Sequence, residues 1–232
     1  MNKTQYTLLV LFSLLFVTLL NAQHRRYIIR NGIAIGGGLT QFDISTDNFN
    51  TNAGKGWIIS TSATGDLPNK WYNVSYGLQI SENNIEISGY ESETNLVVDK
   101  QVKYNLFAVQ LVFLFHAKVV PNLLTIDAGP MLQYNGELDL QTNNEENLFI
   151  YLNNGNSLLA NELEEVSQIN ANGAIGATLG LGAFKFRAQY IYGFTNILNK
   201  LNGNDSEFGP NSENTDFKGN QSMINFMVLI TF

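Results

Sequence analysis

The side chains that most often carry acid–base or nucleophilic chemistry are sparse in this chain. It has two histidines, His24 and His116, and no cysteine. Thiol nucleophiles, disulfides, CxxC zinc sites and iron–sulfur clusters are therefore excluded. The sequence also lacks the GxSxG, HExxH, Walker A and GxGxxG motifs. We predict that the protein is not an enzyme and that it carries no cofactor.

Charged side chains point away from one partner class and leave one metal hypothesis open. The chain has 13 Lys plus Arg against 20 Asp plus Glu, a formal charge of −7, and no basic run, so nucleic acid is excluded as an expected partner. The segment 137–165 holds seven acidic residues and no Lys or Arg. Its carboxylates could bind Ca²⁺ or Mg²⁺. Solvation of a long loop explains them better, because no EF-hand-like spacing is present, so no metal site is assigned.

The N-terminus has the pattern of an export signal. Lys3 precedes a 13-residue apolar run at 8–20, and Asn21-Ala22 then precedes Gln23. This run fits a secretory signal but is too short to cross a bilayer as a helix. We predict a signal peptide at 1–22 and one mature domain at 23–232; a retained N-terminal anchor is the alternative.

The mature chain alternates between apolar and polar residues with a period of two, which is the pattern of β-strands. Each segment is about as long as a tilted membrane-spanning strand. Eight segments show the pattern: 32–42, 57–66, 71–81, 103–115, 124–139, 169–181, 185–196 and 222–232.

The fifth segment, 124–139, shows how the two faces differ. Leu132, Tyr134 and Leu138 belong to its apolar face, and Asp127, Gln133 and Glu137 to the opposite one. A polar face of this kind does not suit the core of a soluble β-sandwich. It suits a barrel with apolar side chains outside and polar side chains within.

The connections between these segments alternate in length. Long connections lie at 43–56, 82–102, 140–168 and 198–221, with a short surface helix expected in 158–169. The short ones lie at 67–70, 116–122 and 182–184. Outer-membrane barrels have short periplasmic turns and long extracellular loops. The sequence therefore predicts an all-β, eight-stranded, antiparallel up-and-down transmembrane barrel in the outer membrane, with both termini in the periplasm.

An eight-stranded barrel has a lumen that side chains fill, so no continuous pore is expected. Charges inside such a lumen need partners. Asp127 and Arg187 lie near the periplasmic starts of the fifth and seventh segments, on the inner parity. We predict a lumenal ion pair between them; the alternative is that each bonds to neighbouring amides and hydroxyls.

Several short stretches together resemble a known family. They are Asn21-Ala22-Gln23, the strand 124–134 with its Gly-Pro-Met-Leu-Gln-Tyr, the stretch 190–198 and the terminal Phe232. The chain resembles the small outer-membrane β-barrel family of Bacteroidota labelled PorT-like. The resemblance implies the same architecture, and its name-giving member takes part in gliding and protein secretion. Phe232 resembles the C-terminal signal that the barrel-assembly machinery reads, which implies a transient partner.

These observations lead to one expected function and two alternatives. We expect a non-enzymatic barrel in contact with outer-membrane lipid, whose loops serve envelope integrity or recognition of a surface partner. One alternative is an accessory subunit of a PorT-like secretion or gliding apparatus. The other is a soluble periplasmic barrel resembling a lipocalin, with an apolar interior. The positions of Asp127, Gln133, Glu137 and Arg187 distinguish this last alternative.

Overall fold

The computed structural model describes residues 30–67, 69–93, 96–142, 148–203 and 216–232. The signal peptide predicted at 1–22 lies outside the described residues. Among the described residues, no helix is long and apolar enough to cross a bilayer.

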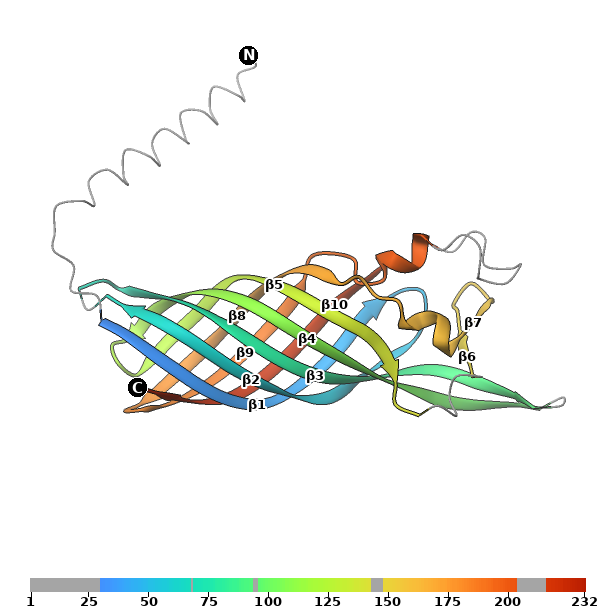
Figure 1. Cartoon of the computed structure of the whole chain (residues 1–232), viewed down its shortest axis with the longest axis horizontal. Helices are drawn as coiled ribbons and strands as arrows, with labels where there is room; N and C mark the ends of the chain where they lie inside the picture. Colours follow the sequence, from blue (N-terminus) through green and yellow to red (C-terminus); the bar gives the residue numbers. More distant parts are fainter. Residues whose placement is uncertain (1–29, 68, 94–95, 143–147, 204–215) are drawn as a thin grey trace, which may run out of the picture.

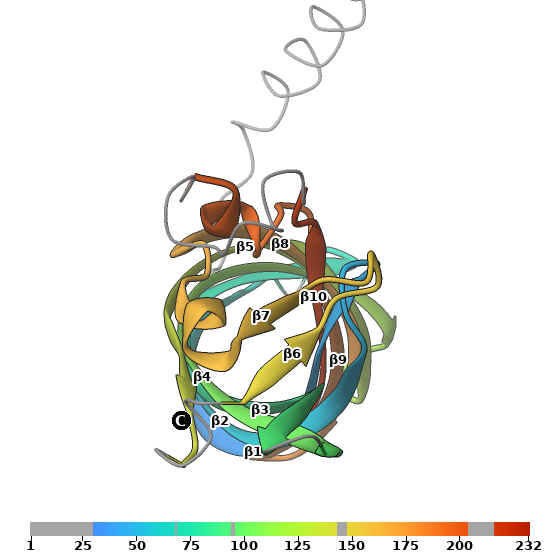
Figure 2. The ribbon, with the colours of Figure 1, turned by 90° about the vertical axis from the view of Figure 1, so that its right-hand side faces the viewer.

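The described chain forms one antiparallel sheet that closes on itself. Neighbouring strands pair in the order β1, β2, β3, β4, β5, β8, β9, β10, and β10 pairs with β1 to complete a ring of eight. The strands are β1 (Arg30–Thr46), β2 (Thr51–Asp66), β3 (Tyr72–Glu93), β4 (Leu96–Val120), β5 (Leu124–Leu140), β8 (Ile169–Leu181), β9 (Phe184–Gly193) and β10 (Gly219–Thr231). Figure 1 shows the barrel from the side, and Figure 2 along its axis. The predicted fold class is confirmed.

The wall of the barrel is apolar outside and polar inside over most of its length. Five outward side chains are 46–71% exposed: Leu39, Tyr76, Leu111, Phe186 and Phe226. Buried inward side chains are mostly polar: Thr40, Ser60, Ser75, Gln79, Ser81, Gln110, Gln133, Asn170, Asn172, Gln189 and Asn225. The parity predicted from the sequence is therefore confirmed for this part of the wall.

Two glycines lie where the backbone of the neighbouring strand comes too close for a side chain. A Cβ atom on Gly38 would lie 1.9 Å from the carbonyl oxygen of Phe226. One on Gly129 would lie 1.9 Å from the carbonyl oxygen of Phe113. No side chain fits at such a distance, so these positions require glycine for the strands to curve closely around the lumen.

The prediction of a long loop at 82–102 is wrong. β3 and β4 continue through it as a paired hairpin that extends to Glu93 and Leu96 and projects beyond the ring (Figure 1). The polar residues of the segment suggested a loop, but the period of two persists with the faces exchanged. Ile85, Ile87 and Val102 now point inward and are fully buried.

A second correction concerns the end of the fifth strand. Leu106 pairs with Leu138 but Ala108 pairs with Asn135, so β5 has one extra residue at this place. Such a bulge reverses the parity beyond it. Leu138 is therefore buried and Glu137 exposed, the opposite of the faces predicted for them.

The loop end of the barrel is covered by segments that pack on an apolar core. β6 (Phe149–Tyr151) pairs with β3, and β7 (Ser157–Leu159) pairs with β6. The short helices η3 (Ala160–Glu164) and η4 (Asn199–Gly203) follow β7 and β9. A helix was expected near η3, but its Leu163 is buried rather than on the surface. We call this set of buried apolar side chains the apolar cap: Ile44, Phe49, Ile85, Ile87, Val102, Tyr104, Leu106, Leu138, Ile150, Leu158, Leu163, Val166, Ile197, Leu198 and Phe217.

The side chains on the wall therefore change character at one level, which we call the crossover level. On β3 the outward residues pass from Leu78 and Ile80 to Glu82 and Glu86. On β4 they pass from Phe107 to Asn105, and inward residues become apolar at the same height. Toward the turns the barrel has the polarity of a membrane protein, and toward the loops that of a soluble one.

Candidate functional site

Asp127, on β5, lies inside the lumen and contacts four side chains there. Its side chain is fully buried. Its Oδ1 atom lies 2.7 Å from His116 Nδ1 and accepts a hydrogen bond from Thr125 at 2.6 Å. Its Oδ2 atom accepts a hydrogen bond from Thr178 and lies 3.7 Å from Arg187 Nε. We call Ser75, His116, Thr125, Asp127, Thr178 and Arg187 the Asp127 cluster.

The structure brings together the two residues singled out as a lumenal pair. Arg187 Nε donates to the Thr178 hydroxyl at 3.0 Å, and that hydroxyl in turn donates to Asp127. The direct Arg187–Asp127 separation is 3.7 Å, so the two predicted arrangements, an ion pair and bonds to neighbouring hydroxyls, coexist. A carboxylate without water around it is stable only with such partners.

His116 is the member of the cluster that sequence reasoning missed. It was placed in the turn 116–122, but β4 continues to Val120 and His116 points into the lumen. Its pairing register with Asp127 across β4 and β5 makes the contact direct. The inward parity of Gln110, Val112 and Leu114 on the same strand would have indicated this position for His116.

His116 also contacts a serine, which gives a familiar sequence of groups. Its Nε2 atom lies 2.7 Å from Ser75 Oγ. A hydroxyl, an imidazole and a carboxylate in this order can activate a nucleophile. Here, however, Ser75 is 2% exposed and is not among the residues that line the cavity beside His116. A substrate carbonyl could not reach its oxygen, so the geometry supports a structural role.

Above the Asp127 cluster, four amide side chains and Gln133 close the lumen. Gln133 accepts hydrogen bonds from Gln110 at 2.8 Å and from Asn172 at 2.7 Å. It donates to Gln221 at 2.9 Å and to Asn135. These residues come from β4, β5, β8 and β10, on different sides of the ring. The cavity beside them has a volume of about 10 Å³, room for about one water molecule.

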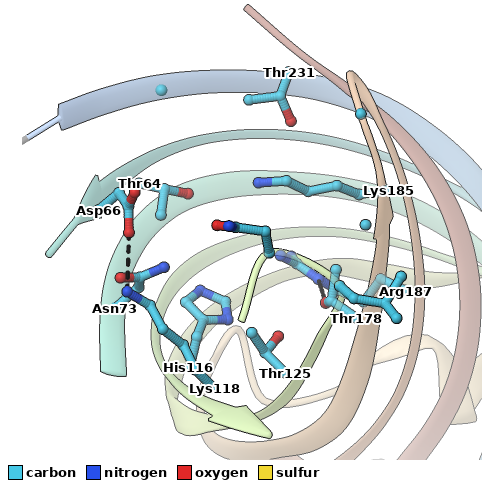
Figure 3. A pocket seen from close by; sticks show the side chains of 15 residues that line it. Thr64, Asp66, Asn73, His116, Lys118, Thr125, Thr178, Lys185, Arg187 and Thr231 are labelled. Atoms are coloured by element: carbon cyan, nitrogen blue, oxygen red, sulfur yellow. Dashed lines mark hydrogen bonds and ion pairs between the residues drawn. The ribbon is translucent and has the colours of Figure 1, made fainter. Parts of the chain in front are cut away.

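Below the Asp127 cluster, the barrel opens into a cavity of about 340 Å³ at the end where the chain terminates. We call it the mouth pocket (Figure 3). Three basic side chains line it, Lys118, Lys185 and Arg187, with Asp66 as the carboxylate in the lining. Lys118 is bound to Asp66 Oδ1 at 3.1 Å and to the Leu67 carbonyl at 2.9 Å.

The loop end offers a different surface, on the outer part of the β3–β4 hairpin. Tyr90 stacks on Phe149 with ring centroids 5.4 Å apart and contacts Tyr151 at 4.5 Å. The Tyr151 hydroxyl donates to Asp99 Oδ1 at 2.8 Å, which raises the pKa of the phenol because it stabilises the protonated form. The three rings bind β6 to the hairpin.

The acidic segment 137–165 does not gather its carboxylates in the part that the structure describes. No group of three or more His, Asp or Glu side chains suited to a metal ion occurs among the described residues. Glu145 and Glu146 lie outside those residues. The calcium or magnesium hypothesis thus gains no support from the described geometry.

Comparison with known proteins gives similarity of overall shape to small barrels. No protein-family model and no curated protein sequence matches the chain. Neisserial surface protein A (NspA) is 11% identical with a TM-score of 0.46, covering 86% of this chain and 97% of that one. Ail, the attachment invasion locus protein of Yersinia pestis, is 10% identical with a TM-score of 0.41, covering 88% and 99%. LpxR from Salmonella typhimurium is 8% identical with a TM-score of 0.24, covering 86% and 99%. Identities this low transfer no function to this chain, and the PorT-like resemblance stays a prediction.

Proposed function

We propose that the protein is a non-enzymatic outer-membrane β-barrel that holds a partner-binding surface outside the cell. The observation that carries this proposal is the inverted polarity of a closed ring. Exposed apolar side chains on every side are unstable in water but favourable in hydrocarbon, and only a closed sheet satisfies its backbone there.

The apolar belt has the height that an outer membrane requires. On β3 it extends from Tyr72 to Ile80, about nine residues, which at about 3.3 Å per residue and a tilt of about 40° gives about 23 Å. Aromatic rings flank it. Trp71, Tyr72 and Phe115 contact one another at the mouth end, and Trp57 donates to Glu82 at the crossover level. Rings at both edges are typical of membrane barrels.

The lipocalin-like alternative requires the opposite arrangement. It needs an apolar interior that holds a ligand and a polar exterior. Asp127, Gln133 and Arg187 are 0%, 3% and 5% exposed and lie inside the ring. Of the residues chosen to decide this point, Glu137 alone is outside, and it lies beyond the bulge, at the loop end.

The proposed role in recognition rests on a difference between the connections at the two ends of the barrel. The mouth end has only short connections, whereas the loop end carries the projecting hairpin, β6, β7 and both short helices (Figure 1). In outer-membrane barrels the elaborate end faces outward. With the lumen closed by amides, the loop-end surface is where this protein would bind a partner outside the cell.

Two experiments test location and orientation. Fractionation should recover the mature protein in the outer membrane, and its mobility on a gel should shift on boiling. Because the chain has no cysteine, single cysteines can be labelled selectively. Val98→Cys on the hairpin should react with an impermeant maleimide on intact cells, and Ala183→Cys in the β8–β9 turn should react only after the cells are opened. Soluble recovery, or the reverse labelling, would refute the proposal.

A secretion or gliding complex would use the same hairpin, so partner identity needs its own test. Gentle solubilisation and affinity capture of the full chain should be compared with a variant lacking 89–100, in which Ser88 and Gln101, a pair in the ladder, are joined by a turn. Large envelope proteins lost with the hairpin would favour the secretion role. Binding of host or neighbouring-cell material, lost in the same variant, would favour surface recognition.

A further inference from the structure

The mouth pocket has an unbalanced set of charges. Lys185 and Arg187 are two residues apart on β9 and lie on the same inward face. Lys118 shares its charge with Asp66, and Arg187 shares its charge with Asp127. Lys185 makes no hydrogen bond or ion pair with any residue that the structure describes. Two adjacent cations in a partly enclosed space repel each other unless an anion lies between them.

Several hydrogen-bond donors in the same space lack partners. The two terminal amino groups of Arg187 bond to no residue in the described part of the chain, since Nε makes its contacts with Thr178 and Asp127. The Thr231 hydroxyl is buried and likewise has no partner among the described residues. Thr231 and Lys185 both line the pocket, on the neighbouring strands β10 and β9.

The space itself results from residues without side chains. Gly180 lies opposite Lys185 in the β8–β9 ladder, and Gly32 and Gly182 also line the pocket. Figure 3 shows Lys185 extending from β9 into the cavity, with Arg187, Thr64 and Thr231 around it. A volume of about 340 Å³ is at the lower end of the range for small-molecule sites.

We infer that the mouth pocket binds a small organic anion through a carboxylate or phosphate group placed between Lys185 and Arg187. The Arg187 guanidinium presents its two terminal amino groups to two oxygens of the anion. The Lys185 ammonium supplies a positive charge that no carboxylate of the described chain pairs with. Lys118 and its partner Asp66 lie at the edge and limit the net charge of the site. On the proposed function, this pocket faces the periplasm, so the ligand would enter from there.

The test is calorimetric titration of the folded full-length protein in detergent with succinate and, separately, with glycerol phosphate, using glycerol as the neutral control. We expect saturable binding of at least one anion, none of glycerol, and weaker binding as sodium chloride is added. The two titrations show whether the carboxylate or the phosphate is preferred. No saturable heat with either anion would overturn the inference.

Matched variants distinguish specific binding in the mouth pocket from general electrostatic attraction of anions to the protein. Lys185→Gln should weaken binding about tenfold or more, as expected for loss of one charge-assisted contact. Lys185→Arg should retain it. Lys103→Gln removes the same charge at the opposite end of the barrel and should bind like the wild type. Equal affinity of the Lys185→Gln and Lys103→Gln proteins would also overturn the inference. Mobility on unboiled gels shows that each variant is folded, and cysteine labelling tests location separately.

Discussion

Asp127 shows how a charge is kept inside a barrel wall. It is 0% exposed and contacts His116, Thr125, Thr178 and Arg187. Removing the carboxylate leaves Arg187 and His116 with unmatched donors. Removing Arg187 leaves the carboxylate with three remaining donors. The two single substitutions should therefore differ in cost.

We expect Asp127→Ala to lower the free energy of unfolding by about 3–5 kcal/mol, as for other broken buried pairs. Arg187→Met should cost less, because its terminal amino groups face the mouth pocket. The double variant should be more stable than the sum of the two losses predicts, by about 0.5–3 kcal/mol. Urea unfolding in lipid vesicles measures all three. Additive losses would show that the two residues do not interact.

Ser75 provides a second prediction at the residue scale. Its hydroxyl is buried beneath His116, so a fluorophosphonate probe should not label the folded protein, and Ser75→Ala should leave the labelling pattern unchanged. The measurement is mass spectrometry of the probe-treated barrel. Labelling at Ser75 that disappears in Ser75→Ala would mean that the three-residue sequence of hydroxyl, imidazole and carboxylate is a working nucleophile.

At the scale of the elements, the strands depend on close approach at particular glycines. Gly38→Ala places a methyl carbon 1.9 Å from the Phe226 carbonyl oxygen, and the β1–β10 ladder that closes the ring cannot accommodate it. We expect this variant not to show the folded mobility on unboiled gels. Gly180→Ala is the matched control, since its nearest neighbour would be 3.4 Å away. Normal folding of both variants would contradict this explanation of the glycines.

How far the sequence predicts these elements depends on where they lie along the barrel axis. β8 was expected at 169–181 and has those bounds, because in the membrane-facing wall outward residues are apolar at every second position. The hairpin of β3 and β4 was missed because the period of two continues there with the faces exchanged. Glu137 and Leu138 were assigned to the wrong faces because a one-residue bulge leaves no mark in the composition. Asp127 and Arg187 were found by parity, whereas His116 was missed because its strand was ended too early.

For the whole molecule, the filled lumen has a functional consequence. The amides around Gln133 and the apolar cap lie in series between the mouth pocket and the loop end. Reconstituted into a planar bilayer, the folded protein should give no stable single-channel conductance steps. The double variant Gln110→Ala/Gln133→Ala should still conduct little, because the apolar cap remains. Stable wild-type openings would show that the lumen rearranges in a bilayer.

The crossover level also determines how deeply the cylinder is immersed. A shift of one residue pair along the tilted strands changes the depth by about 5 Å. In one direction, the carboxylate of Glu82 would enter the edge of the hydrocarbon, where a charged side chain costs up to about 1 kcal/mol. In the other, rings such as Phe107 would leave lipid for water and lose their favourable solvation. The projecting hairpin is thereby kept at a constant height above the lipid surface. In the proposed orientation, this height sets the distance at which the hairpin meets a molecule that approaches the cell.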